Sequence, residues 1–241
     1  MNTPLNNSKY PTKARIRFSL LALCLLLLSA CSTTQKVAIN QADMSCAFLE
    51  NDCSLLTVGG KDQTGLRWLN PAAHWTQYNK IIIDPVTFWG GATATISASN
   101  QQMLVNYFSQ QLYKELGQKF QIVTEPGPGV MKLDVAIVDA SSATPVLRSI
   151  SMIIPQARVL STLKFLATGT FPFVGAAQAE ARVTDSVSGQ VLALAVDKRV
   201  GGGSFTTGFQ WQWGDAENAV NHWAELAANR LSAWTSGKAP Q

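Results

Sequence analysis

Two histidines, His74 and His222, are the side chains of this 241-residue chain that could act as general bases near neutral pH. Hydrolases of known motif classes place such a base near a Gly-x-Ser-x-Gly turn, and many zinc enzymes use His-x-x-x-His spacing. The sequence contains neither pattern. His222 lies one position off the apolar stripe of a predicted helix, and His74 lies in an irregular segment. We therefore predict that the protein is not an enzyme.

Carboxylate pairs can also carry acid–base chemistry, and two such pairs are close in the sequence. Asp134 and Asp139 fall in one predicted strand, where a separation of five residues places their side chains on opposite faces. Asp215 and Glu217 stand at the start of a predicted helix, where capping by Asp215 and the helix dipole account for acidic residues. We therefore assign no catalytic residue, no metal site and no cofactor.

The chemistry of cysteine gives a more specific signal at the start of the chain. Residues 1–30 combine a basic segment that ends at Arg17 with an apolar run over residues 18–28, which is typical of a secretory signal peptide. The run is shorter than the about 20 apolar residues that cross a bilayer. It ends in Leu28-Ser29-Ala30-Cys31, which resembles the lipobox of bacterial lipoproteins.

This resemblance implies cleavage between Ala30 and Cys31, followed by acylation of the Cys31 thiol and of the new amino terminus. Several acyl chains, at about 0.8 kcal/mol per buried CH₂, would anchor the chain lastingly in a membrane. Ser32 rather than Asp follows the cysteine, which favours the outer membrane of a Gram-negative bacterium, with the domain facing the periplasm. An uncleaved anchor, or secretion with a coincidental cysteine, is the alternative.

Cys46 and Cys53 remain as an even pair, because Cys24 lies in the signal segment and Cys31 would carry lipid. An oxidising compartment favours a disulfide between them, worth about 2.5 kcal/mol in the chain-entropy model. Two free thiols or two metal ligands are the alternatives, although no histidine or further cysteine lies nearby to complete a zinc site.

The charge balance excludes a strongly basic nucleic-acid-binding protein. The chain has 19 Lys and Arg against 15 Asp and Glu, but four of the basic residues and none of the acidic ones precede residue 31. The remaining chain is formally neutral, whereas phosphate binding needs clustered basic residues. We therefore expect no nucleic acid as a partner.

The hydrophobic pattern divides the chain into five parts. These are a signal peptide over 1–30, a lipidated flexible tether over 31–45, an irregular strap over 46–79, a folded domain over 80–236 and a short tail over 237–241.

Within the folded domain the pattern predicts a strand at 80–86 and an amphipathic helix over 100–116. It also predicts a hairpin from 120–123 and 131–137, a second hairpin from 175–184 and 191–196, and a helix over 215–234. The order is β-α-β-β, a middle segment, then β-β-α. Both helices can cover a mainly antiparallel sheet, so the expected fold class is α/β of the α+β type, in a single domain.

The middle segment is cationic and apolar, since no acidic residue lies between Asp139 and Glu180. After Pro155, apolar residues fall on one helical face, as in a helix that lies on a membrane or a partner protein. A core helix under the sheet is the alternative. The candidate contact residues are Arg158, Val159, Leu160, Leu163, Lys164 and Leu166.

A second candidate surface precedes the last helix. Phe209, Trp211 and Trp213 alternate, so an extended strand would present all three rings on one face. Such rings could stack on a sugar or contact a partner, and burial against the sheet is the alternative.

Several strings together resemble the DUF3313 family of bacterial lipoproteins. They are the segment from Cys46 to Leu56, Ile83-Asp-Pro-Val86, Val123-Thr-Glu-Pro-Gly-Pro-Gly129, Gly175 to Leu192, and Trp213-Gly-Asp-Ala216 with Trp223-Ala-Glu225. The family is uncharacterised, so the resemblance implies a lipoprotein and a fold but no mechanism.

From these features we expect a lipoprotein that is anchored in the outer membrane through Cys31 and binds or positions an envelope partner. The competing expectation is a carrier, in which apolar segments enclose a lipid or another small apolar ligand.

Overall fold

The computed structural model describes residues 34–39, 46–90, 96–141, 175–201 and 213–238, all of which belong to one compact unit spanning residues 33–241. The two long helices are α2 (Ala98–Gly117) and α6 (Gly214–Thr235), and two 3₁₀ helices are η2 (Glu50–Leu55) and η3 (Trp75–Gln77). The strands are β1 (Thr34–Lys36), β2 (Thr57–Val58), β3 (Leu66–Leu69), β4 (Lys80–Ile83), β5 (Thr87–Phe88), β6 (Gln121–Ile122), β7 (Val130–Ser141), β8 (Ala176–Asp185) and β9 (Val191–Gly201).

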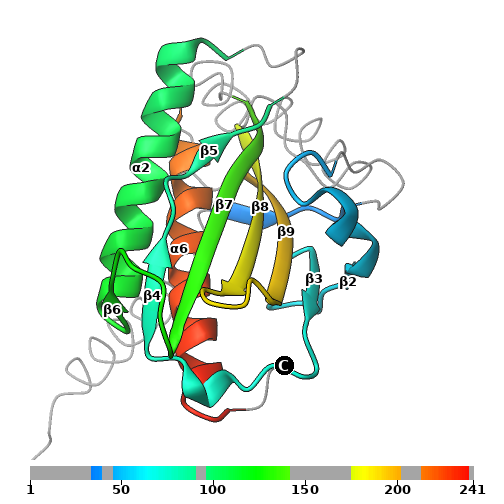
Figure 1. Cartoon of the computed structure of the whole chain (residues 1–241). Coiled ribbons are helices and arrows are strands. Elements are labelled where there is room, and N and C mark those ends of the chain that lie inside the picture. The colour runs from blue at the N-terminus through cyan, green and yellow to red at the C-terminus, as the bar shows by residue number, and fades with distance from the viewer. Residues whose placement is uncertain (1–33, 40–45, 91–95, 142–174, 202–212, 239–241) are drawn as a thin grey trace, which may run out of the picture. The chain divides into compact units, whose positions relative to one another are not determined.

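One sheet joins these strands in the order β2-β3-β9-β8-β7-β4-β6, with β1 also paired to β9 and β5 to β7 (Figure 1). The pairings among β1, β2, β3, β7, β8 and β9 are antiparallel, whereas β4 and β5 run parallel to β7. The chain thus forms a mixed α+β domain with a large sheet and two main helices, as the element order predicts.

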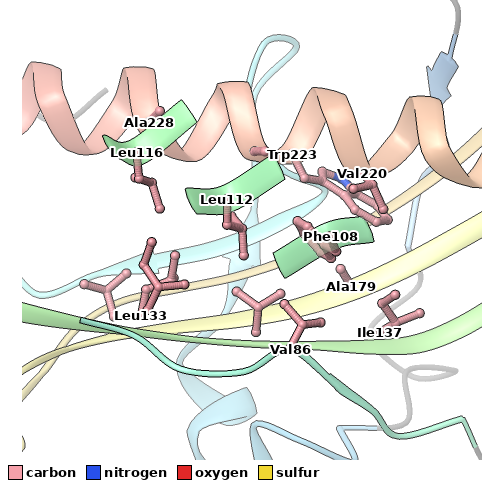
Figure 2. Close-up of a cluster of buried hydrophobic side chains, with 14 of the residues drawn as sticks. Val86, Phe108, Leu112, Leu116, Leu133, Ile137, Ala179, Val220, Trp223 and Ala228 are labelled. Carbon is pink, nitrogen blue, oxygen red and sulfur yellow. The ribbon is translucent and has the colours of Figure 1, made fainter. Parts of the chain in front are cut away.

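Both helices bury one apolar stripe against the sheet. The hydroxyl of Ser97 caps α2 by accepting a hydrogen bond from the Asn100 amide at 3.3 Å. Phe108 and Leu112 of α2, together with Trp223 of α6, then point toward the strands (Figure 2). The rings of Phe108 and Trp223 lie 5.8 Å apart, so the two helices also pack on each other.

The second predicted hairpin is confirmed by the pairing of β8 with β9. Its turn is held by Asp185, whose Oδ1 accepts from the amides of Val187 at 3.1 Å and Ser188 at 2.7 Å. Gly189 has a φ of 72°, a conformation that glycine adopts without strain. These hydrogen bonds stabilise the charged carboxylate and lower the pKa of Asp185.

The first predicted hairpin is wrong, because β6 does not pair with β7. Instead β6 runs parallel to β4, and β4 lies between β6 and β7. The helix α2 therefore connects two parallel neighbours, a connection that needs a crossover rather than a tight turn. Short apolar runs indicate strands but do not reveal which neighbour each strand takes.

Two segments expected to be irregular contribute strands. Thr34–Lys36 of the predicted tether pairs with residues 199–201 at the end of β9, and β3 of the predicted strap pairs with residues 193–196. β9 itself continues to Gly201, beyond the predicted end at residue 196. β8 pairs with one side of β9, and the backbone groups on the other side of β9 also need hydrogen-bond partners. β1 and β3 supply them.

Candidate ligand-binding site

A cavity of about 130 Å³ lies between the sheet and the two helices. Its size is close to that of engineered cavities of about 150 Å³ that accept benzene. Strands β3, β7, β8 and β9 form its floor, and α2 and α6 form its roof.

Small side chains on neighbouring strands create this cavity. Ala181 of β8 stands opposite Ala195 of β9, and this pair is flanked by Val135 of β7 and Arg67 of β3 in one cross-strand row. All four residues line the cavity. Although they face α6 from the middle of the sheet, Ala181 and Ala195 are only half-buried, which opens the cavity toward solvent.

The roof comes from residues that follow one face of α6. Trp223 and Leu231 are buried, while Leu226 and Ala227 are half-buried. Phe108 and Leu112 of α2 close the far side. The lining is therefore apolar over most of its surface.

Two arginines stand at the more exposed part of the lining. Arg67 comes from β3 and Arg230 from α6, and both are half-buried. Arg230 donates a hydrogen bond to the Asp62 carbonyl at 2.9 Å. Burial lowers the pKa of Arg67, and repulsion from Arg230 lowers it further, which indicates that the two positive charges act on each other.

A buried polar network forms another part of the wall. Asp197 is 3% exposed; its Oδ1 accepts from the Gly65 amide at 2.7 Å, and its Oδ2 accepts from Trp223 Nε1 at 2.8 Å. Arg199 pairs with the same carboxylate at 3.4 Å and donates to Thr34 Oγ1 at 2.8 Å. The charge of Asp197 is thus compensated within the fold.

The opposite face of the sheet holds the loop closed by Cys46 and Cys53. The predicted disulfide between them is confirmed, with Cα atoms 6.1 Å apart. Glu180 Oε2 accepts from the amides of Phe48 at 3.1 Å and Leu49 at 2.9 Å. Burial raises the pKa of Glu180, an effect that these two hydrogen bonds oppose.

Arg182 fixes the same loop from the neighbouring position on that face. It donates to the Leu49 carbonyl at 3.1 Å, pairs with Asp52 at 3.0 Å and lies over the Phe48 ring at 5.7 Å. These three contacts of Arg182 hold the loop against the sheet.

The predicted aromatic surface is wrong for Trp213, which is 4% exposed and belongs to the main core. Trp213 immediately precedes α6, and the apolar face of that helix draws the ring inward. Phe209 and Trp211 lie outside the described residues, as do Ala30 and Cys31. The same holds for every candidate contact residue of the middle segment, which are Arg158, Val159, Leu160, Leu163, Lys164 and Leu166.

The predicted separation of Asp134 and Asp139 is wrong. A register shift between Ile137 and Asp139 adds one residue, so Asp134 stands opposite Arg182 and Asp139 opposite Gln178, on the same face of β8. They still form no shared site, since Lys132 pairs with Asp134 at 3.0 Å and Lys198 with Asp139 at 3.2 Å.

Asp215 does not cap α6 as predicted. The helix begins at Gly214 after Trp213, with no side-chain cap, and Asp215 is buried. Its Oδ2 accepts a hydrogen bond from the Gly175 amide at 2.8 Å. The carboxylate therefore joins two segments that are 40 residues apart in the sequence.

His222 is half-buried rather than fully on the surface. Burial lowers its pKa, and the nearby Arg199 lowers it further. The described residues contain no group of three His, Cys, Asp or Glu side chains that could hold a metal ion. Among the same residues, no helix is long and apolar enough to cross a membrane.

Sequence reasoning missed the residues that create the cavity. A signal for them exists in the chain: Ala177, Ala179 and Ala181 alternate along β8, and Ala193 and Ala195 alternate along β9. Alanines on one face of two paired strands leave room under a covering helix. No local sequence pattern indicates that Arg67 and Arg230 both line this cavity.

Among known proteins, a relative from Escherichia coli K12 named "Uncharacterized lipoprotein YdcL" is 26% identical over 152 residues. The match covers 61% of this chain and 66% of the relative, slightly under two thirds of its length. The relative's name supports the predicted lipoprotein character, but it gives no activity.

Two solved structures resemble the fold distantly. A PelC dodecamer from Paraburkholderia phytofirmans is 10% identical, with 66% of this chain and 94% of that chain covered and a TM-score of 0.36. Protein XCC0632 from Xanthomonas campestris is 11% identical, with 75% and 96% covered and a TM-score of 0.35. At these scores the likeness carries no functional argument.

The family model described as "Protein of unknown function (DUF3313)" matches residues 47–227, the region that holds strands β2 to β9, all of α2 and most of α6. This match agrees with the resemblance noted in the sequence, and the chain belongs to the DUF3313 family.

Proposed function

We propose that this chain is a non-catalytic lipoprotein, anchored in the outer membrane and facing the periplasm, whose folded domain binds a small apolar ligand. The observation that carries the ligand proposal is the cavity over Ala181 and Ala195. Its lining is mostly apolar, yet these two alanines are only half-buried. A group of about the size of benzene or a short acyl segment would fill this space and bury the exposed alanines.

The lipobox at Cys31 and the name of the YdcL relative support the anchor. Acyl chains on the first residue of the mature chain would keep the cavity near the membrane surface, where amphiphiles are concentrated. An anchored domain with such a cavity is suited to capture or present an apolar molecule.

Binding can be tested by comparing compounds that co-purify with the full chain and with Ala181→Leu. The larger side chain occupies the cavity, so we expect the organic extract of the wild-type protein to contain a compound that the variant lacks. Ala72→Leu adds the same atoms at an exposed position and serves as the control. Identical extracts from all three proteins, with no bound compound, would contradict the proposal.

A second function, adaptor for an envelope protein, is supported by the acid-free sequence between Asp139 and Glu180. Photo-crosslinkers placed at Arg158 and Thr162 in intact cells test it. One dominant envelope protein in the trapped species would favour the adaptor. Crosslinks only to lipid, or none, would leave the ligand-binding function as the better account.

A further inference from the structure

We propose that the ligand is an anionic, single-chain amphiphile whose head group binds between Arg67 and Arg230 while its chain enters the cavity. This inference rests on the proposed ligand-binding function and adds the chemical class of the ligand. It follows from a separation of two environments within one cavity, a cationic end and an apolar end.

The cationic end is formed by elements from both layers of the fold. Arg67 belongs to the floor, because it stands opposite Ala195 in the cross-strand row. Arg230 belongs to the roof on α6, seven residues after Trp223. Both residues line the cavity and both are half-buried, so a head group between them would still reach solvent.

The charges at this end favour an anion. Burial lowers the pKa of Arg67, and repulsion from the positive charge of Arg230, which lines the same cavity, lowers it further. An anion between them would remove that repulsion. Asp197, the acidic residue in the described lining, pairs with Arg199 at 3.4 Å.

The apolar end limits the rest of the molecule. The cavity of about 130 Å³ is walled by Phe108, Leu112, Val183, Leu231 and the strand alanines. This volume accepts one short chain and not the two chains of a diacyl lipid. Head and tail must also be adjacent, which describes a fatty acid or a single-chain phosphate ester.

Arginine suits both of these head groups. Its planar guanidinium donates two parallel hydrogen bonds to a carboxylate or a phosphate, and such charge-assisted bonds are about twice as strong as neutral ones. Because Arg67 and Arg230 approach from different layers, they could bind two oxygens of one head group.

The test uses the full chain in nanodiscs of neutral phosphatidylcholine and three photoreactive probes. The probes share a five-carbon chain, which suits a cavity of about 130 Å³, with a diazirine at its tail. They differ in the head group: a carboxylate, a phosphate monoester or an alcohol. After irradiation, mass spectrometry measures labelling of the cavity peptides from β8, β9 and α6. Protein variants Arg67→Gln and Arg230→Gln remove one charge each, and Lys119→Gln removes an exposed charge on the surface as control.

We expect the carboxylate, the phosphate or both to label the cavity about tenfold more than the alcohol, and each arginine variant to reduce that labelling about tenfold. The ratio of the two anionic probes identifies the preferred head. Equal labelling by acid, phosphate and alcohol, unaffected by the arginine variants, would overturn the anionic class and leave ligand binding intact. No cavity labelling by any probe would overturn both proposals.

Discussion

The carboxylate of Asp197 accepts hydrogen bonds from three groups: the Gly65 amide, the Trp223 indole and the Arg199 guanidinium. A carboxylate that is 3% exposed depends on such donors, since burial without them costs several kcal/mol. Trp223 is therefore both an apolar wall of the cavity and a polar support of its neighbour.

Trp223→Phe should separate these two roles. The variant keeps an aromatic ring but removes the donor to Asp197 Oδ2, so we expect a loss of about 1.5–3 kcal/mol in the free energy of unfolding beyond the loss of ring volume. Trp234→Phe is the control, because the indole nitrogen of Trp234 makes no hydrogen bond within the described residues while its ring also contacts the cavity. Denaturant unfolding of both variants measures the difference. Equal destabilisation would show that the hydrogen bond is unimportant.

Glu180 gives a prediction about pH. Its raised folded-state pKa means that the folded state holds the proton more tightly than the unfolded state. The tighter proton binding therefore stabilises the folded state below the unfolded-state pKa of about 4.3, and this stabilisation is lost as the pH rises through the folded-state pKa of Glu180. In Glu180→Gln this loss is absent.

We therefore expect the unfolding free energy of Glu180→Gln, minus that of the wild type, to increase as the pH rises from about 4 through the raised pKa of Glu180. Other carboxylates contribute equally to both proteins, and Glu225→Gln controls for the loss of one negative charge at an exposed site. Denaturant unfolding at a series of pH values tests this. A difference that stays flat or falls across the interval would show that burial does not raise the pKa of Glu180.

Single residues also mark where sequence reasoning reaches its limit. The pairing of Cys46 with Cys53 is predictable because the chain offers no other pair once the signal segment is set aside. The role of Asp215 is not, since its partner Gly175 is distant in the sequence. An aspartate near the start of a helix fits a capping role equally well whether or not it binds a distant segment, so the local sequence does not distinguish the two roles.

At the scale of elements, the paired strands β8 and β9 combine a predictable feature with an unpredictable one. Alternation over residues 175–184 predicts a strand with one solvent-exposed face. The structure confirms the strand as β8, whereas Glu180 on the predicted exposed face is buried under the disulfide-closed loop. The register shift after Ile137 of β7 could not be predicted, because one extra residue leaves the local pattern intact and changes only the face on which the later residues of the strand lie. The β4–β6 pairing is hidden for a related reason, since partner choice depends on the crossover of α2.

The cavity makes a prediction for β8 that distinguishes two alanines on the same face. Ala181→Val adds two methyl groups toward the cavity, and we expect a gain of about 0.5–2 kcal/mol in the free energy of unfolding. Ala177→Val makes the same change four residues earlier, where the side chain is 2% exposed and packed in the core, and should cost about 1–3 kcal/mol.

Because both variants raise the β-propensity of one strand equally, the difference between them reports the space above each residue. Unfolding of the ligand-free proteins in denaturant provides the measurement. A loss of stability in both variants would show that the space over Ala181 is not available to a side chain.

For the whole molecule, the fold places the cavity and the disulfide-closed loop on opposite faces of one sheet. The cavity lies under α2 and α6, while the loop closed by Cys46 and Cys53 packs through Glu180 and Arg182 on the other face. The strand β1 follows Cys31 by only a few residues and pairs with β9, whose Asp197 and Ala195 line the cavity. β1 therefore lies in the same sheet as the strands that line the cavity.

Anchoring itself gives the last prediction, because Cys31 and Cys24 lie close together and only Cys31 completes the lipobox. In a Gram-negative host, Cys31→Ala should abolish the acylated amino-terminal peptide and remove the protein from the outer-membrane fraction, whereas Cys24→Ala should leave both unchanged. Acyl chains dominate membrane affinity at about 0.8 kcal/mol per buried CH₂, so no other part of the mature chain is expected to replace them. Mass spectrometry of the amino-terminal peptide and gradient separation of the two membranes measure these effects. If Cys31→Ala remained in the outer membrane with an unchanged peptide mass, the anchor would have to lie elsewhere, and the placement of the cavity near the membrane surface would lose its basis.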